Sequence, residues 1–357
     1  TGHNNVFIGY QSGDKTSAGG YSVIIGELAG HADFTAAADG TIAIGYQALS
    51  AAVDGVGNVG IGFNALVSMV SGNYNTAVGY KALEDNNEDD DTENTAVGFN
   101  AAMNLSTGVR NIAIGGRSMG SGIVTGDGNV GMGQASLYAL TSGARNTAIG
   151  TAAGIGLTSS NDCTFVGYQA GEDVDSAGST PAGCTYIGSY SGKWMDDGTH
   201  NTAVGFNAMV GFEGGSIGDL NVAIGKDALK AINDGDANTV VGALAGDAIA
   251  GAAGNTIVGY NAGSSVSGGT NTLIGYQAGT DTVALTSGAN NVAIGVNVRT
   301  TAVDTGNAIV IGADIAGAAN DITMGKASNT MQNDFDTDAT WTQSSDVRKK
   351  KNIEDAK

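Results

Sequence analysis

Two cysteines, Cys163 and Cys184, carry the most reactive side chains of the chain, and they occupy equivalent positions in the sequence. They hold the same place in two similar segments, Cys163-Thr-Phe-Val-Gly167 and Cys184-Thr-Tyr-Ile-Gly188. If these segments stack in register as neighbouring strands, the two Cα atoms lie roughly 5 Å apart, which suits a disulfide. Two small buried thiols are the equal alternative, and a bond is favoured if the protein matures outside the cell. Two cysteines are too few for a disulfide framework or a multi-cysteine zinc site.

The densest set of potential metal ligands is the run 84–93, with seven acidic residues and two Asn. Such oxygen ligands suit Ca²⁺, but the run lacks the Gly and Glu at the sixth and twelfth positions of an EF-hand loop. A solvated acidic loop is therefore favoured over a calcium site, and no cofactor is expected. His3, His31 and His200 are scattered without metal-ligand spacing. No carboxylate pair for glycoside cleavage can be assigned, because the acidic residues cluster between the repeats described next.

An internal repeat fills the chain, and it must position all of these side chains. Asn75-Thr-Ala-Val-Gly79 returns as Asn201-Thr-Ala-Val-Gly205, and nineteen copies align on their glycine. Positions are counted from this motif glycine, so −1 precedes it and +1 follows it. Ten of the eighteen spacings are 17 residues, and the others run from 13 to 21. The pattern predicts one coil of a solenoid per repeat, with the insertions in loops. The motif glycines are Gly9, Gly26, Gly45, Gly62, Gly79, Gly98, Gly115, Gly133, Gly150, Gly167, Gly188, Gly205, Gly225, Gly242, Gly259, Gly275, Gly295, Gly312 and Gly325.

The three positions before each glycine read as a short strand. Position −3 is Val, Ile or Thr and position −1 is Ile, Val or Met in every copy. Because alternate residues of a strand share a face, we expect these β-branched residues to form the interior of the solenoid. Position −2 is mostly Ala or Gly, so the second face is also apolar and should be covered by a partner chain. This pattern predicts an oligomer.

Three further positions predict turns and tight packing. The glycine is expected where a positive φ or close coil stacking excludes a Cβ. Position +3 is Ala or Ser in seventeen copies, which indicates a tight site, and position −4 is Asn in thirteen copies, which suggests an internal amide ladder. An array of Asn side chains that binds sugar is the less favoured interpretation. Representative structural residues are Asn75, Thr76, Val78, Gly79 and Ala82 in one copy, and Asn201, Val204, Gly205 and Ala208 in another.

Composition excludes several classes of function. The 357 residues include 59 Gly without a three-residue period and a single Pro, Pro181, which argues against collagen and against a disordered linker. A formal net charge of −20 argues against binding to nucleic acid or to an anionic membrane. No apolar run reaches the length of a membrane span, so no membrane insertion is expected. The chain starts Thr1-Gly-His without a Met, so we expect a fragment or a processed form.

Two features offer surfaces for a partner. An aromatic residue often follows the motif glycine, as at Tyr80, Phe99 and Tyr276. Such a column could stack sugars, although covering a corner of the solenoid is the favoured interpretation. The lengthened loops at 84–93 and 172–183 are the expected variable contact surfaces.

The repeat resembles the head repeats of trimeric autotransporter adhesins, and it is more similar still to the related repeats of phage tail fibres. The resemblance covers about residues 4 to 328, although the period here is longer than that of the adhesin head. It implies an all-β parallel solenoid, a β-roll or β-helix of about nineteen coils of roughly 17 residues, assembled as a homotrimeric fibre. Residues 1–328 would form the solenoid and 329–344 a connector.

Residues 345–357 resemble the start of the intramolecular chaperone domain that follows many phage tail spikes and fibres, the endosialidase-type family. Ser345, Asp346, Arg348 and Lys350 match its opening pattern, as do Asn352 and Ile353, whereas Lys349 replaces a Leu. By this resemblance Ser345 would be the nucleophile of a single self-cleavage and Lys350 its base. Twelve residues follow Ser345, so the domain would be incomplete. Self-cleavage apart, the chain is not expected to be an enzyme.

The sequence therefore favours a structural and adhesive segment of a phage tail fibre in the virion. Expected partners are two further copies of the chain, other tail or fibre proteins, and a glycan or protein receptor on the host surface. A bacterial surface adhesin of the trimeric autotransporter type is the main alternative. It predicts a coiled-coil stalk where this chain has the chaperone-like segment. A tail spike that degrades polysaccharide would need convergent carboxylates, and an ice-binding solenoid would need a flat outward Thr array.

Overall fold

The computed structural model describes residues 3–18, 20–33, 35, 39–86, 92–175, 182–280, 288–336 and 342–344. Within these ranges all regular structure is β-strand and no helix occurs, which confirms the all-β prediction. The chain forms a parallel β-solenoid. It divides into two compact units, Thr1–Asp197 and Gly198–Lys357. No helix in the described ranges is long and apolar enough to span a membrane.

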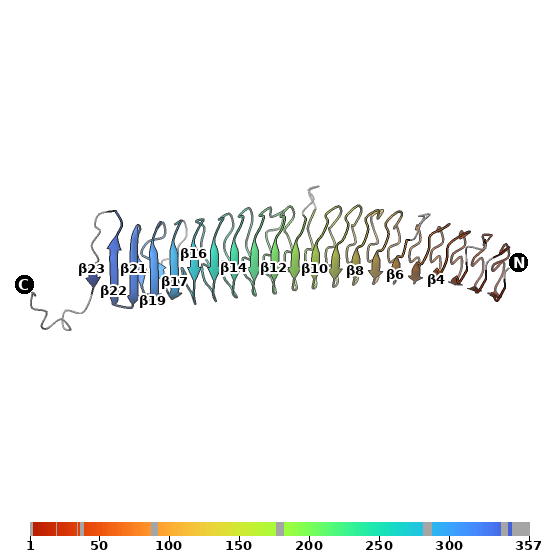
Figure 1. Ribbon diagram of the computed structural model, residues 1–357, viewed down its shortest axis with the longest axis horizontal. Helices are drawn as coiled ribbons and strands as arrows, with labels where there is room; N and C mark the ends of the chain where they lie inside the picture. Colours follow the sequence, from red (N-terminus) through yellow and green to blue (C-terminus); the bar gives the residue numbers. More distant parts are fainter. Residues whose placement is uncertain are drawn as a thin grey trace, which may run out of the picture. The chain divides into compact units, whose positions relative to one another are not determined.

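The described part of unit 1 holds eleven three-residue strands, each of which ends directly before a motif glycine. Adjacent strands pair in parallel and in register, as Thr76↔Thr95 and Thr164↔Thr185 illustrate. In Figure 1 the arrows of this unit lie side by side, with a loop between each strand and the next. The strands are β1 (Val6–Ile8), β2 (Val23–Ile25), β3 (Ile42–Ile44), β4 (Val59–Ile61), β5 (Thr76–Val78), β6 (Thr95–Val97), β7 (Ile112–Ile114), β8 (Val130–Met132), β9 (Thr147–Ile149), β10 (Thr164–Val166) and β11 (Thr185–Ile187).

Unit 2 continues the same pattern and then changes. Strands β12 to β17, β19 and β21 pair in parallel, and each carries a motif glycine within it or directly after it. The predicted connector 329–344 contains two antiparallel strands, β22 and β23, which extend from β21. Strands β18 and β20 form a separate parallel pair. The bounds are β12 (Thr202–Val204), β13 (Val222–Ile224), β14 (Thr239–Val241), β15 (Thr256–Val258), β16 (Thr272–Ile274), β17 (Val292–Val296), β18 (Arg299–Thr300), β19 (Ile309–Ala313), β20 (Ala316–Gly317), β21 (Asp321–Lys326), β22 (Asn329–Asp334) and β23 (Thr342–Ser344).

Both expected reasons for the motif glycine are present. Gly9 has φ = +135° and Gly205 has φ = +137°, a region that L side chains rarely adopt. A Cβ on Gly9 would lie 2.6 Å from the carbonyl oxygen of Gly26, the motif glycine of the next coil. A Cβ on Gly205 would lie as close to Gly225 O. The corner after each strand therefore stacks backbone directly on backbone.

Left-handed backbone recurs at further positions of the coil. In most coils, residues at −5, +2 and +4 have φ between about +50° and +60°, for example Arg145, Ala152 and Leu83. This conformation costs an L residue roughly 1–2 kcal/mol, and Asn and Asp tolerate it best. Position +2 is Asn or Asp in seven of the nineteen copies, which fits this requirement. The glycine corner and these residues together bend the chain tightly enough to close a narrow coil.

The prediction of which strand face lies inside was wrong. Position −2 is buried in all the motif strands except β1, with Ala77, Phe165 and Tyr186 fully buried. Positions −3 and −1, as in Thr76 and Val78, are half-buried or exposed. Each three-residue strand turns only its central side chain, at −2, into the coil. The rest of the interior is filled by the residues at +3, +4 and +7. The β-branched pairs consequently form an outward face on the sheet.

Candidate functional site

The predicted amide ladder exists and runs through the interior of unit 1. The side-chain oxygen of each Asn at −4 accepts a hydrogen bond from the backbone N–H of the −4 residue in the next coil. Asn75 N donates to Asn58 Oδ1 over 2.9 Å, and Asn94 N donates to Asn75 Oδ1 over 3.1 Å. The Asn58 side chain also donates to the carbonyl oxygen of Gly72, over 2.7 Å. Each amide therefore joins neighbouring coils and satisfies buried backbone groups.

Unit 2 has a ladder of the same kind. It starts at Asn201, whose Oδ1 accepts from Asn221 N at 2.8 Å, and it ends where Asn291 Oδ1 accepts from Ala308 N at 2.9 Å. Asn201 and Asn221 are fully buried. A buried amide cannot be reached by a sugar, so the interpretation of this column as a sugar-binding array is wrong. Position +3 is equally enclosed, since Ala82 and Ala208 are fully buried as expected.

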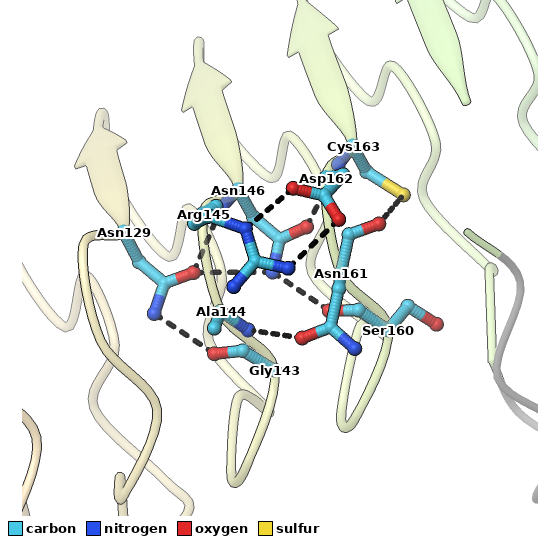
Figure 2. Close-up of polar contacts among 9 residues, drawn as sticks. All are labelled: Asn129, Gly143, Ala144, Arg145, Asn146, Ser160, Asn161, Asp162 and Cys163. Carbon is cyan, nitrogen blue, oxygen red and sulfur yellow. Dashed lines mark hydrogen bonds and ion pairs between the residues drawn. The ribbon is translucent and has the colours of Figure 1, made fainter. Parts of the chain in front are cut away.

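The ladder of unit 1 ends on a cysteine, as Figure 2 shows. Asn146 accepts from Cys163 N at 3.0 Å, and the Cys163 thiol donates to Asn161 O at 3.4 Å. Cys163 and Cys184 are both buried and lie in neighbouring, in-register coils. A hydrogen bond with Cys184, together with burial, raises the pKa of the Cys163 thiol, which disfavours the reactive thiolate. The predicted disulfide stays a prediction.

A second set of inter-coil contacts was not predicted. The Asn161 side chain, at position −6, accepts from Ala144 N at 2.8 Å, and Asp236 accepts from Asp219 N at the same distance. Beside Asn161, Arg145 and Asp162 form a bidentate ion pair with hydrogen bonds of 2.6 and 2.8 Å (Figure 2). The hydrogen bond from Arg145 lowers the pKa of the Asp162 carboxyl. We call these hydrogen bonds, from a backbone N–H to a side-chain oxygen at −6 of the next coil, backbone caps. The sequence signal for them is an Asn or Asp at position −6.

The outward face is the main candidate for an interaction surface. It consists of the −3 and −1 side chains of the motif strands, and position −1 is Ile, Val or Met in every copy. In unit 1 the exposed fraction is 39% at Met132 and 40% at Ile149, and in unit 2 it is 41% at Ile224. Because the strands pair in register, the −1 side chains form a continuous apolar row along each unit, beside a −3 row in which Thr alternates with Val and Ile. Contiguous apolar surface of this kind marks a contact site in soluble proteins.

Aromatic side chains form a second row at position +1. Tyr46, Phe63, Tyr80 and Phe99 stack on one another with centroids 5.1 to 5.5 Å apart and interplanar angles of 10° to 18°. In unit 2, Tyr260 stacks on Tyr276 at 5.5 Å. Between 39% and 49% of the surface of each of these six residues is exposed, so the rings lie on the outside of the coils, and the covering of a corner stays a prediction. Their faces are turned toward one another, which leaves mainly ring edges for a sugar or another partner.

Several predicted sites lie wholly or partly outside the described residues. Ser345 and Lys350 belong to the segment after 344, and residues 87–91 of the acidic run are likewise not described. Among the described residues, no group of three or more His, Cys, Asp or Glu side chains could hold a metal ion. The calcium and self-cleavage hypotheses therefore stay predictions.

The comparisons add no relative. No family model matches the sequence, and no curated protein matches it significantly.

Proposed function

We propose that the chain is a structural and adhesive segment of a homotrimeric fibre of the phage tail-fibre type, which supports attachment to a host surface. The observation that carries the proposal is the outward face, where apolar side chains at −1 repeat from coil to coil and are only partly covered by their own chain. A partner surface that buried these rows would remove them from water at roughly 25 cal/mol for each Å² of apolar surface. Identical chains supply identical rows, so they are the natural partners.

The coil suits a scaffold more than a catalyst. Each coil is tied to the next by in-register strand pairing, by the Asn ladder and by backbone caps, so the repeat builds a stiff, regular support. The charge of −20 keeps such an edge-rich assembly soluble. Attachment would then depend on contacts that are weak singly and are repeated over several chains and fibres, which add through effective concentration.

Light scattering of the purified protein tests the assembly. We expect a native mass near three times 35.3 kDa. The double substitution Met132→Lys with Ile149→Lys should dissociate the trimer, because it places two charges in the apolar row. Both side chains are exposed in the single chain, so its circular dichroism spectrum should not change. Ser121→Lys, at an exposed loop position, is the matched control and should leave the mass unchanged.

A monomeric wild-type protein would refute the assembly. The denatured mass, measured on the same sample, reports on the C-terminal segment, since a chain that ends beside Ser345 would support self-cleavage. Attachment is measured separately, by incubating fluorescently labelled protein with a panel of bacteria. Failure to bind any of them would argue against the adhesive part of the proposal.

A further inference from the structure

A small cleft of about 290 Å³ lies on unit 1, on the loops that follow strands β9, β10 and β11. Its lining comes from positions +5 and +6 of three successive coils: Ile155 and Gly156, Glu172 and Asp173, and Trp194. Backbone hydrogen bonds hold the three loops together, from Gly156 N to Glu172 O at 2.9 Å and from Asp173 N to Lys193 O at 2.8 Å. The cleft is thus part of the regular coil stacking.

Trp194 makes this place different from the rest of the solenoid. Position +6 holds no other aromatic residue in the nineteen copies, and the two coils before it have Gly156 and Asp173 there. The indole therefore projects beside two much smaller residues. A Cβ on Gly156 would lie 2.9 Å from Glu172 O, so the stacking of these two loops disfavours a side chain at that position.

A charged and aromatic network fixes the wall of the cleft. The Lys193 ammonium lies 4.4 Å from the Trp194 ring centroid and 5.4 Å from that of Tyr190. It also pairs with the Glu172 carboxylate at 3.1 Å, and Gln169 donates a hydrogen bond to the same carboxylate. Tyr190 packs edge-on against Tyr168, with centroids 5.3 Å apart. These contacts hold the indole and the carboxylate in place before any ligand arrives.

We infer that this cleft binds one neutral pyranose unit of a surface glycan. This inference rests on the proposed attachment function and names the chemistry that it would recognise. An indole offers an apolar surface with a polar edge, which suits the C–H face of a sugar ring. The carboxylates of Glu172 and Asp173, both in the lining, offer acceptors for hydroxyl groups. The volume is at the lower limit for ligand sites and fits a single sugar ring better than a larger ligand.

The charges of the cleft exclude the competing small ligands. An organic cation would normally be drawn to an indole, but the Lys193 ammonium, 4.4 Å from the ring centroid, repels a second positive charge. An anionic sugar or a phosphate would meet the Glu172 and Asp173 carboxylates at the lining. A neutral sugar avoids both repulsions and still uses the polar groups.

Saturation-transfer NMR tests the inference with four probes: the methyl glycosides of glucose, galactose, mannose and N-acetylglucosamine. We expect transfer to the ring protons of at least one of them, and a drop of at least fivefold with Trp194→Ala. Tyr276→Ala removes an exposed ring of the unit 2 stack and is the matched control, which should keep the signal. Trp194→Phe should retain part of it, and circular dichroism checks that each variant is folded.

The opposite results are equally clear. Transfer to none of the four sugars, transfer that Trp194→Ala does not reduce, or binding of tetramethylammonium in their place would overturn the inference. The cell-binding assay separates this from the fibre proposal. If the wild type attaches to cells but binds no sugar in the cleft, only the cleft assignment fails. If sugar binding depends on Trp194 but no cell is bound, the cleft stands and the attachment function fails.

Discussion

The coils of β5 and β10 belong to the same repeat, but the large side chain that fills the interior comes from different positions in the two coils. In the β5 coil the central strand residue is Ala77, and the buried side chain at +4 is Leu83. In the β10 coil the central residue is Phe165, and position +4 is Gly171. A Cβ on Gly171 would lie 2.7 Å from the Phe165 ring. The large side chain is therefore at +4 in the β5 coil and at −2 in the β10 coil.

The same exchange recurs along the chain. Tyr186 faces Gly192, and in unit 2 Leu273 faces Gly279, where a Cβ would lie 2.9 Å from the leucine side chain. Ala223 in unit 2 is instead matched with a buried Leu229. In most coils, therefore, one large side chain fills the interior, and it stands either at −2 or at +4. Ala148 and Gly154 are both small, and the space at Gly154 is filled by Phe165 and Leu137 of the neighbouring coils. Close packing demands this, because a void and an overlap both destabilise a core.

The largest effect is expected from breaking this match at β10. Phe165→Ala should destabilise unit 1 by about 3–5 kcal/mol, because it leaves a cavity beside Gly171. Gly171→Leu alone should also destabilise, since the new side chain overlaps the ring. The double variant, which rebuilds the β5 arrangement, should recover about 1–3 kcal/mol relative to the sum of the two. Urea denaturation of the four proteins measures this coupling.

The control for this cycle is a pair in different units. Phe165 belongs to unit 1 and Leu229 to unit 2, so the effects of Phe165→Ala and Leu229→Ala should add. Additive behaviour of Phe165→Ala with Gly171→Leu would contradict the idea that the two positions share one volume.

The end of the amide ladder gives a smaller effect. Asn146→Ala should cost about 2–3 kcal/mol, because it leaves Cys163 N and Ser160 O without their buried partner. Cys163→Ala, one coil later, removes only a thiol and should cost about 1 kcal/mol. Chemical denaturation compares the two, with Asn238→Ala as the matched ladder variant in unit 2. Equal losses for Asn146→Ala and Cys163→Ala would show that the ladder contributes no more than side-chain packing.

The smallest effect concerns the left-handed backbone. Ala152→Gly should stabilise unit 1 by about 0.5 kcal/mol, because relief at φ = +56° exceeds the added freedom of the unfolded chain. The neighbouring Ala153→Gly is the control, since this residue is fully buried and does not have a positive φ. It should destabilise. A thermal denaturation series resolves the two signs, and destabilisation by both would argue against strain at +2.

Much of the coil could be read from the repeat, because its strongest constraints act on single positions. The motif glycine, the small +3 residue and the Asn at −4 each have one steric or hydrogen-bonding reason, and each is found as predicted. The faces of the strand could not be assigned from hydrophobicity, because both faces are apolar. The missed signal was the exchange of size between positions −2 and +4, as in Ala77 with Leu83 and Phe165 with Gly171.

Other features were hidden for different reasons. The bidentate pair of Arg145 and Asp162 depends on how two loops stack, and most copies have no charged residue at this position, −5. The cleft beside Trp194 depends on the contrast between one large residue and its small neighbours at +6. An alignment of the repeats highlights the residues that the copies share, so it does not draw attention to position +6, where only one copy has a large aromatic residue.

The direction of the hydrogen bonds between coils also sets how a unit would carry a mechanical load. Strand pairing, the Asn ladder and the stacked glycines all join one coil only to its immediate neighbours, as Gly26 N donating to Ile8 O at 2.8 Å illustrates. Tension along the stacking direction would therefore act on a series of similar interfaces. They would give way one at a time, and each detached coil of 17 residues would release roughly 55 Å of extended chain. Such a unit would absorb a sudden pull in steps and yield without breaking a covalent bond.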